Sequence, residues 1–312
     1  NDLIRGEIVF ESELLGDIVL AKDLDTPLYN FAVVVDDADM EITHVIRGDD
    51  HLSNRPKQVL IQEALGLNQP EYAHLPLILN PDRSKLSKRH GGTSVTEYKN
   101  MGYLPQAMLN FMALMGWHPT TEQEIFSLDE LIKEFDLARV QKAGAIFDKE
   151  KLNSINRHYI KQLVPAELAE HLVPYLMQYN PSREQLIKTA HLFQSRLNKF
   201  SEIKELAAFI FDLPKYQPSL LNWKNSSASE VKNNLETALM VLEKLSEDSF
   251  NIDTTTTELM PVANKIGRGE LLWPLRVALS GLEKSPGPFE IMEVLGRQES
   301  LSRIKKAIAK IK

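Results

Sequence analysis

Hydrophobic residues in the first 95 positions form short runs that are typical of buried strands. The runs at 17–21, 31–35 and 43–47 are rich in β-branched residues, and a further apolar run at 74–79 ends in the turn sequence Asn80-Pro81-Asp82. Runs of this kind without polar alternation indicate strands that are covered on both faces. The pattern therefore predicts a buried sheet in this part of the chain.

A helix with clear boundaries is predicted between the last two of these runs. Asn54 can cap its first turn, Pro56 lies in that turn, and Gly66 ends the helix after an apolar face at 59–65. The order strand, helix, strand predicts a parallel α/β layer.

Beyond residue 92 the apolar period changes to that of helices. Ser127 and Glu130 form a capping box before one of them. Apolar positions predict further helices at 104–115, 131–135, 186–197, 231–245 and 301–311, with a linker at 215–229 and loops at 251–257 and 283–288.

Composition narrows the class of protein. The 312 residues include 43 % hydrophobic and 25 % charged residues, have a net charge of −7 and contain no cysteine. Disulfides and thiolate metal ligands are therefore excluded, and no run of about 18 apolar residues could span a membrane. His44, His74 and His90 share no metal-ligand spacing, so no metal site is predicted from these residues. With no signal sequence at its start, we expect a cytoplasmic protein without a membrane partner.

The basic segment at 84–92 carries the clearest candidate chemistry. Lys85, Ser87, Lys88 and Arg89 follow a predicted strand and precede Gly91-Gly92. Ammonium groups on such a loop could follow the charge that develops on a leaving pyrophosphate. The alternative is an ordinary solvated basic loop, and composition alone does not separate the two.

A second constellation is Arg47-Gly48-Asp49-Asp50-His51, at the end of a predicted strand. Arg47 suits a carboxylate ligand, and the acidic pair could accept ribose hydroxyls or hold magnesium. The alternative is a polar turn in which Arg47 pairs with one of the two aspartates.

For three other groups of polar residues, a structural role is the simpler interpretation. Tyr29, at the predicted strand entrance, could touch a substrate but is more simply a packing residue. The acidic residues at 36, 37 and 39 are expected to form a turn. The basic residues near the C-terminus are expected to form a solvated face that complements the helix dipole: Arg303, Lys305, Lys306, Lys310 and Lys312.

Taken together, these segments resemble the glutamyl-tRNA synthetases, a family of class I aminoacyl-tRNA synthetases. The basic loop is similar to the KMSKS signature of that class, with Leu86 and Arg89 replacing its Met and final Ser. The resemblance covers essentially the whole chain, through segments at 28–37, 42–52, 85–91, 101–105, 125–128, 147–153, 274–281 and 285–290.

The resemblance implies ATP- and Mg²⁺-dependent activation of L-glutamate and its transfer to tRNA(Glu). It implies a role for Lys85, Ser87 and Lys88 in catalysis, with Lys88 on the ATP phosphates. It further implies that Asp50 and His51 lie beside the nucleotide, that Tyr29 and Arg47 hold glutamate, and that Arg196 contacts the anticodon.

The implied fold is α/β followed by all-α. Residues 1–95 would be the second half of a Rossmann-like catalytic domain, with 1–28 the tail of a connecting insert. Residues 96–164 would be a helical stem-contact junction, and residues 165–312 an α-helical anticodon-binding region with subdomains at 165–225 and 226–312. A monomer is expected.

One departure from the family stands out, because no His-x-Gly-His segment occurs in these residues. We therefore expect the chain to be the C-terminal two-thirds of the enzyme and to form no glutamyl adenylate by itself. Alternatives are a catalytically inactive tRNA-binding module, a glutaminyl-tRNA synthetase relative, and a helical adaptor without a nucleotide site. The glutaminyl alternative is disfavoured because Arg47 suits a carboxylate and the second half predicts helices rather than β-barrels.

Overall fold

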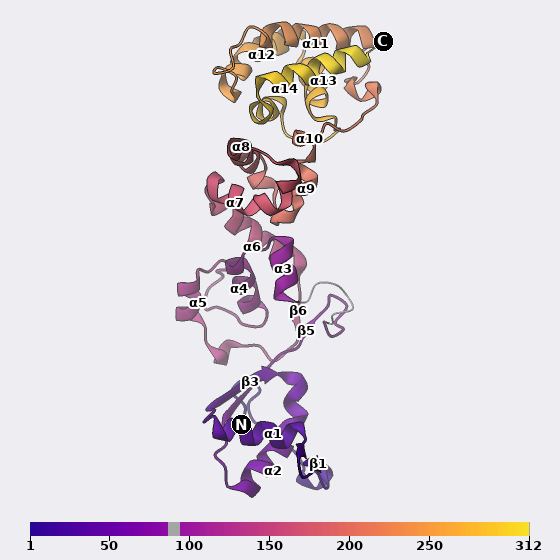
Figure 1. Cartoon of the computed structure of the whole chain (residues 1–312). Helices are drawn as coiled ribbons and strands as arrows, with labels where there is room; N and C mark the ends of the chain where they lie inside the picture. Colours follow the sequence, from indigo (N-terminus) through magenta and orange to yellow (C-terminus); the bar gives the residue numbers. More distant parts are fainter. Residues whose placement is uncertain (87–93, 312) are drawn as a thin grey trace. The chain divides into compact units, whose positions relative to one another are not determined.

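The computed structural model describes residues 1–86 and 94–311 of the chain (Figure 1). The chain divides into two compact units. The first, here called the N-terminal unit, comprises residues 1–99 and 104–155, and the second, the helical unit, comprises residues 100–103 and 156–312.

A parallel strand pair forms the centre of the α/β part of the N-terminal unit. Strand β3 (His44–Gly48) pairs with β4 (Glu71–Leu75), and Arg47 lies opposite His74. The connection consists of the 3₁₀ helix η2 (Asp49–Asn54) and helix α2 (Arg55–Leu65). The predicted strand–helix–strand unit is thus confirmed.

The boundaries of α2 confirm one predicted signal and correct another. Gly66 ends the helix with φ +65°, a left-handed conformation in which glycine has no steric penalty. The Asn54 side chain makes no capping hydrogen bond, so this part of the prediction is wrong. Residues 49–54 already form a helical turn, and Nδ2 of Asn54 instead lies 3.3 Å from Nδ1 of His51.

The strand predicted at 31–35 is helical. Helix α1 (Tyr29–Asp39) packs on α2 and buries Val34, so the acidic residues 36, 37 and 39 lie on a helix rather than in a turn. The run at 17–21 is also mostly irregular: the 3₁₀ helix η1 (Ser12–Leu15) precedes it, and β1 (Ala21–Asp23) starts only at its end and pairs with β2 (Thr26–Pro27).

The apolar run at 74–79 forms two strands rather than one. Strand β4 ends at Leu75, and β5 (Ile78–Leu79) pairs with β6 (Ala145–Ile146) in a separate parallel pair. Pro76 lies at the break, where it has no N–H to donate to a strand ladder.

Helices complete the N-terminal unit. The capping box predicted at Ser127 and Glu130 is confirmed at the start of α5. A core of Ile4, Ala73, Trp117, Phe126, Leu131 and Val140 joins this part to β4. The remaining elements are α3 (Val95–Met101), α4 (Pro105–Leu114), α5 (Leu128–Glu134) and η4 (Leu137–Arg139), followed by α6 (Lys149–Gln162), which runs into the helical unit.

The described part of the helical unit contains helices and loops. Its long helices α11 (Ala228–Leu242), α13 (Arg268–Ser280) and α14 (Pro288–Lys310) pack on one another, and α12 (Ile252–Ile266) packs on each of them (Figure 1). The elements are α7 (Pro165–Leu176), η5 (Met177–Tyr179), α8 (Arg183–Phe193), η6 (Gln194–Arg196), η7 (Phe200–Glu202), α9 (Ile203–Leu206), α10 (Ala208–Phe211), η8 (Pro218–Leu221), α11 (Ala228–Leu242), α12 (Ile252–Ile266), α13 (Arg268–Ser280) and α14 (Pro288–Lys310). The prediction of a loop at 251–257 is wrong, because Asn251 caps α12 there.

Among the described residues, no helix combines the length and apolar character that a bilayer crossing requires.

Arg303 is buried, so the prediction of a solvated basic face on α14 is wrong at this residue. It is only 1 % exposed, and its guanidinium donates to the carbonyl oxygens of Phe209 and Leu279, both at 2.7 Å, and of Ile210, at 2.9 Å. Nε donates to Glu299 at 2.7 Å. One side chain thus joins α14 to α10 and to the end of α13. Lys305 and Lys306, by contrast, are exposed as predicted.

Candidate functional site at the end of strand β3

The candidate site lies where strand β3 ends and η2 begins. Arg47 is the penultimate residue of β3, and Asp50 and His51 follow in the η2 turn. Because β3 and β4 are parallel, their carboxyl ends meet at one edge, where open α/β sheets bind ligands. Gln58 of α2 and Tyr29 of α1 are hydrogen-bonded to residues of this edge.

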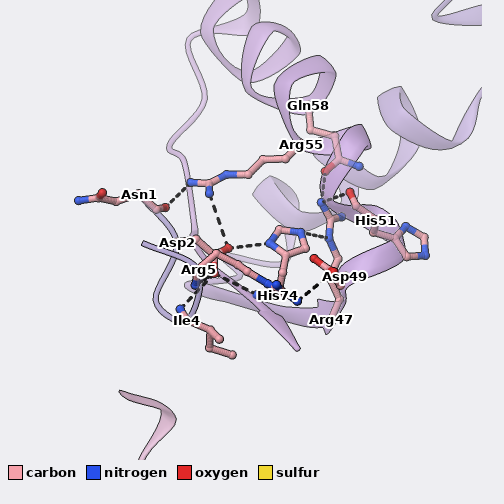
Figure 2. A network of polar contacts seen from close by, with 10 residues as sticks. All are labelled: Asn1, Asp2, Ile4, Arg5, Arg47, Asp49, His51, Arg55, Gln58 and His74. Carbon is pink, nitrogen blue, oxygen red and sulfur yellow. Dashed lines mark hydrogen bonds and ion pairs between the residues drawn. The ribbon is translucent and has the colours of Figure 1, made fainter. Parts of the chain in front are cut away.

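The guanidinium of Arg47 is held on one side by three acceptors (Figure 2). Nε donates to Nε2 of His74 at 3.2 Å, and Nη2 donates to Oε1 of Gln58 at 2.9 Å. The third contact, from Nη2 to the carbonyl oxygen of His51, is long at 3.4 Å. Within the described chain, Nη1 has no hydrogen-bond partner. The arrangement leaves this end of a fixed cation available to an anionic ligand.

The alternative in which Arg47 pairs with a neighbouring aspartate is wrong. Asp49 forms an ion pair with Arg5 at 2.9 Å, and Asp50 forms one with Lys85 at 2.8 Å. Each carboxylate of the turn is thus engaged by a cation from elsewhere in the N-terminal unit.

The buried imidazole of His74 contacts Arg47, and the buried carboxylate of Asp2 contacts His74. Oδ2 of Asp2 lies 2.6 Å from Nδ1 of His74, and neither side chain is exposed. Oδ1 of Asp2 accepts the backbone N–H groups of Ile4, Arg5 and His74. Burial raises the pKa of Asp2, but the hydrogen bonds from His74 and from these N–H groups outweigh it and hold the pKa below its usual value. Burial lowers the pKa of His74, against the opposing effect of Asp2.

Gln58 is the acceptor of the shortest hydrogen bond of Arg47, at 2.9 Å. Its Nε2 donates to Oδ1 of Asn30 at 3.1 Å, which leaves Oε1 as the acceptor for Arg47. Gln58 is buried, so its amide is confined to this orientation. Burial raises the pKa of Asp37, on the same helix as Asn30, although the charge of Arg47 opposes this shift.

Tyr29 and His51 lie together at the open side of the site. The tyrosine hydroxyl is 3.4 Å from Nδ1 of His51, and the two ring centroids are 5.7 Å apart. Tyr29 begins helix α1 and is 50 % exposed. It is therefore not a core packing residue, and its hydroxyl is accessible to a ligand.

Lys85 reaches the site from the turn after β5. Leu79 and Lys85 form a β-bridge, and the turn between them is closed by Asp82, which accepts from the Ser84 hydroxyl at 2.6 Å. The side chains of Lys85 and Asp50 are 60 % and 43 % exposed. The hydrogen bond from Lys85 lowers the pKa of Asp50. Ser87 and Lys88, the other predicted catalytic residues, lie outside the described residues.

Arg196 lies in the helical unit, where it lines a hollow of about 540 Å³ with Arg276 and Lys284. Arg276 is anchored there: it donates to Ser285 at 2.9 Å and to the carbonyl oxygen of Glu283 at 2.7 Å, and its guanidinium stacks on Trp273. The hollow thus combines three cationic side chains with the carboxylates of Glu205 and Glu283 and with apolar walls.

No group of three or more metal-ligating side chains occurs in the described ranges 1–86 and 94–311. Asp50 offers one partly exposed carboxylate, and Mg²⁺ is often held by one or two carboxylates together with substrate phosphates. One such carboxylate fits a magnesium ion only together with oxygen ligands from outside the described residues.

The sequence indicates Arg47, Tyr29, Asp50 and Lys85 as candidates but does not indicate the groups that hold Arg47. His74 has no metal-ligand spacing, and no local pattern points to Asp2 or Gln58. The one local signal was a histidine inside an apolar run, which indicates a buried imidazole that needs partners.

Comparison with known proteins assigns a class to both halves of the chain. Residues 1–154 match the family "tRNA synthetases class I (E and Q), catalytic domain", and residues 167–308 match "Anticodon binding domain". The chain therefore contains a class I aminoacyl-tRNA synthetase catalytic domain region followed by an anticodon-binding domain.

Similar full-length proteins give the family more narrowly. The glutamate–tRNA ligases of Desulfitobacterium hafniense and Natranaerobius thermophilus are 41 % and 42 % identical over 97 % and 100 % of this chain. A crystal structure of a glutamate tRNA ligase from Elizabethkingia meningosepticum, in complex with its amino acid, is 34 % identical with a TM-score of 0.88; the match covers 100 % of this chain and 66 % of that one. The chain belongs to the glutamate–tRNA ligase family. It spans 64 % and 65 % of the length of the two curated relatives.

Proposed function

We propose that this chain serves the ATP-dependent attachment of L-glutamate to tRNA(Glu) in the cytoplasm, as a monomer. The observation that carries the proposal is the fixed guanidinium of Arg47 at the carboxyl edge of β3, with Nη1 unengaged by the described residues. The membership of the family described above supports it. Arg47 favours glutamate over glutamine, because a guanidinium has only donors and a carboxylate only acceptors.

In the proposed reaction an oxygen of the glutamate α-carboxylate attacks the α-phosphorus of ATP, and pyrophosphate leaves. The terminal ribose hydroxyl of the tRNA then attacks the carbonyl carbon of the adenylate, and AMP leaves. Arg47 and Tyr29 hold glutamate. The side-chain carboxylate of glutamate displaces the long contact between Nη2 of Arg47 and the carbonyl oxygen of His51. Asp50 and His51 lie beside the nucleotide.

Lys85, Ser87 and Lys88 are proposed to act on the ATP phosphates, with Mg²⁺ neutralising further phosphate charge. The ion pair of Lys85 with Asp50 supports this role, because both groups are largely solvated and such pairs contribute only about 0.2–1 kcal/mol. Lys85 can therefore exchange the carboxylate for a phosphate at little cost, and Lys88 would make the direct contact.

We further propose a role for each region of the chain. Residues 1–95 supply the nucleotide-binding part of the catalytic domain, residues 96–164 contact the tRNA stem, and residues 165–312 bind the anticodon through parts at 165–225 and 226–312. Arg196 is proposed as an anticodon contact. Its place in a hollow that has three cationic side chains against two carboxylates, together with apolar walls, supports the binding of an anionic, base-bearing ligand.

The test is aminoacylation by the complete gene product. We expect ATP-dependent attachment of glutamate to tRNA(Glu), and we expect Arg47→Gln to weaken the use of glutamate far more than the binding of ATP. Attachment of glutamine would support the glutaminyl relative instead. If tRNA bound without any amino-acid activation, the chain would belong to a catalytically inactive binding module.

A further inference from the structure

A continuous chain of buried groups runs from the N-terminal segment to the candidate substrate arginine (Figure 2). Asp2 contacts His74 at 2.6 Å, and His74 contacts Nε of Arg47 at 3.2 Å. The side chains of Asp2 and His74 have no exposed surface, so neither can touch a substrate. Asp2 also lies 3.7 Å from Nη1 of Arg55 and accepts backbone N–H groups, but the route from these two side chains to the candidate site runs through Arg47.

The chemistry of the three groups admits a single arrangement of protons. A guanidinium can only donate, so Nε2 of His74 must be the unprotonated acceptor of the Arg47 Nε–H. The ring is then neutral with its proton on Nδ1, and that N–H donates to the ionised carboxylate of Asp2. Burial, which lowers the pKa of His74, favours the same neutral form. Asp2 therefore selects the tautomer that can hold Arg47.

We propose that Asp2 and His74 are positioning residues that orient the guanidinium of Arg47 toward the substrate carboxylate through the Nδ1–H tautomer of His74. The identity of the ligand as a substrate carboxylate rests on the proposed function, whereas the orientation of Arg47 does not.

Asp2→Asn separates this role from a merely structural one. The side-chain carbonyl oxygen of the introduced asparagine can still accept the backbone N–H groups that Oδ1 of Asp2 accepts, so the N-terminal turn is retained. The amide nitrogen of that asparagine then faces Nδ1 of His74 and donates to it. The proton of His74 must move to Nε2, where it opposes the Nε–H of Arg47, donor against donor. The variant thus keeps the local fold but removes the acceptor of the Arg47 Nε–H, while the contacts of Nη2 with Gln58 and His51 remain.

The experiment has two readouts. The first is the ¹⁵N spectrum of labelled 312-residue chain, which distinguishes protonated from unprotonated ring nitrogens and reports hydrogen exchange at the Arg47 Nε–H. The second is aminoacylation by the complete gene product with separate KM values for glutamate and ATP. Asp25→Asn, an exposed carboxylate in the β1–β2 turn of the same unit, is the matched control.

For the wild type and for Asp25→Asn we expect His74 protonated on Nδ1 only, and slow exchange at Arg47. For Asp2→Asn we expect the proton on Nε2, fast exchange at Arg47, and a glutamate KM roughly 10- to 100-fold higher, the effect of one hydrogen bond to a charged group. The KM for ATP should stay within about twofold. His74→Phe, which removes both ring nitrogens, should reproduce the kinetic effect.

Two results would overturn the proposal. One is a wild-type His74 protonated on Nε2. The other is an Asp2→Asn variant whose tautomer changes while both the exchange at Arg47 and the glutamate KM stay at wild-type values. If the wild-type gene product uses no glutamate at all, the proposed function fails. The positioning role is then decided by the Arg47 exchange alone.

Discussion

Replacement of the buried Arg303 by methionine should destabilise the helical unit strongly. Methionine has a similar length but no donor, so the carbonyl oxygens of Phe209, Ile210 and Leu279 all lose their partner. The ion pair with Glu299 is lost as well. No water reaches a side chain that is 1 % exposed without local opening of the packing.

The magnitude follows from two opposing terms. Each buried acceptor left without a donor costs about 1–3 kcal/mol, which for these carbonyl groups gives roughly 3–9 kcal/mol. Removal of a buried charge returns part of this, because the guanidinium itself was costly to desolvate. We therefore expect a loss of about 3–5 kcal/mol in the free energy of unfolding, in the range measured when one partner of a buried charged cluster is removed.

Urea titration followed by tryptophan fluorescence measures this loss. Trp223 and Trp273, whose ring centroids are 5.1 Å apart, report on the helical unit. The control is Lys305→Met, two residues along the same helix, where the side chain is exposed and pairs with Glu243 on the surface. That control should change stability by less than about 1 kcal/mol. An Arg303→Met variant as stable as the control would refute the reasoning.

Three further predictions concern the N-terminal unit and the helical unit. Lys85→Ala should change the free energy of unfolding by less than about 1 kcal/mol, since its ion pair with Asp50 is exposed. It should lower pyrophosphate exchange by the complete gene product on the order of 10²–10³-fold, and a large loss of stability with no loss of exchange would contradict it. Burial holds the pKa of His74 below 6.5, so the unfolded chain binds a proton there that the native chain does not. The urea midpoint should therefore fall as the pH drops from 6.5 through the lower native pKa, and His74→Gln should flatten this dependence. Gly102→Ala should lower the thermal midpoint, because φ is +87° and a Cβ would lie 2.5 Å from that of Phe200. A strained backbone costs about 1–3 kcal/mol, which corresponds to roughly 2–12 °C for a unit of this size. A midpoint within about 1 °C of the wild type, on the order of measurement error, would exclude that steric conflict.

The elements that sequence predicts well here are those with local end signals. Helix α2 ends at Gly66 and α5 starts at the Ser127 capping box because these signals act within a few residues. The run at 31–35 has no such signal, and a short apolar run fits a buried strand and a buried helix equally well. Its packing against α2, a long-range contact, decides for the helix.

The same distinction applies to the candidate site. Arg47, Tyr29 and Lys85 belong to recognisable segments, so sequence indicates them. Asp2 and His74 are 72 positions apart, and no spacing rule connects a residue of the N-terminal segment to one in β4. Their role becomes visible only when the parallel register places His74 beside Arg47.

The contacts of Arg303 also set an order in which the protein can be completed during synthesis. The carbonyl oxygen of Phe209 receives its donor from a residue 94 positions further along. While the ribosome translates that interval, α10 lacks the donor that its carbonyl groups have in the folded protein. The segment at 208–211 therefore lacks these donors until position 303 has been translated, and a nascent chain stopped before that position would expose an incompletely packed segment to chaperones and proteases.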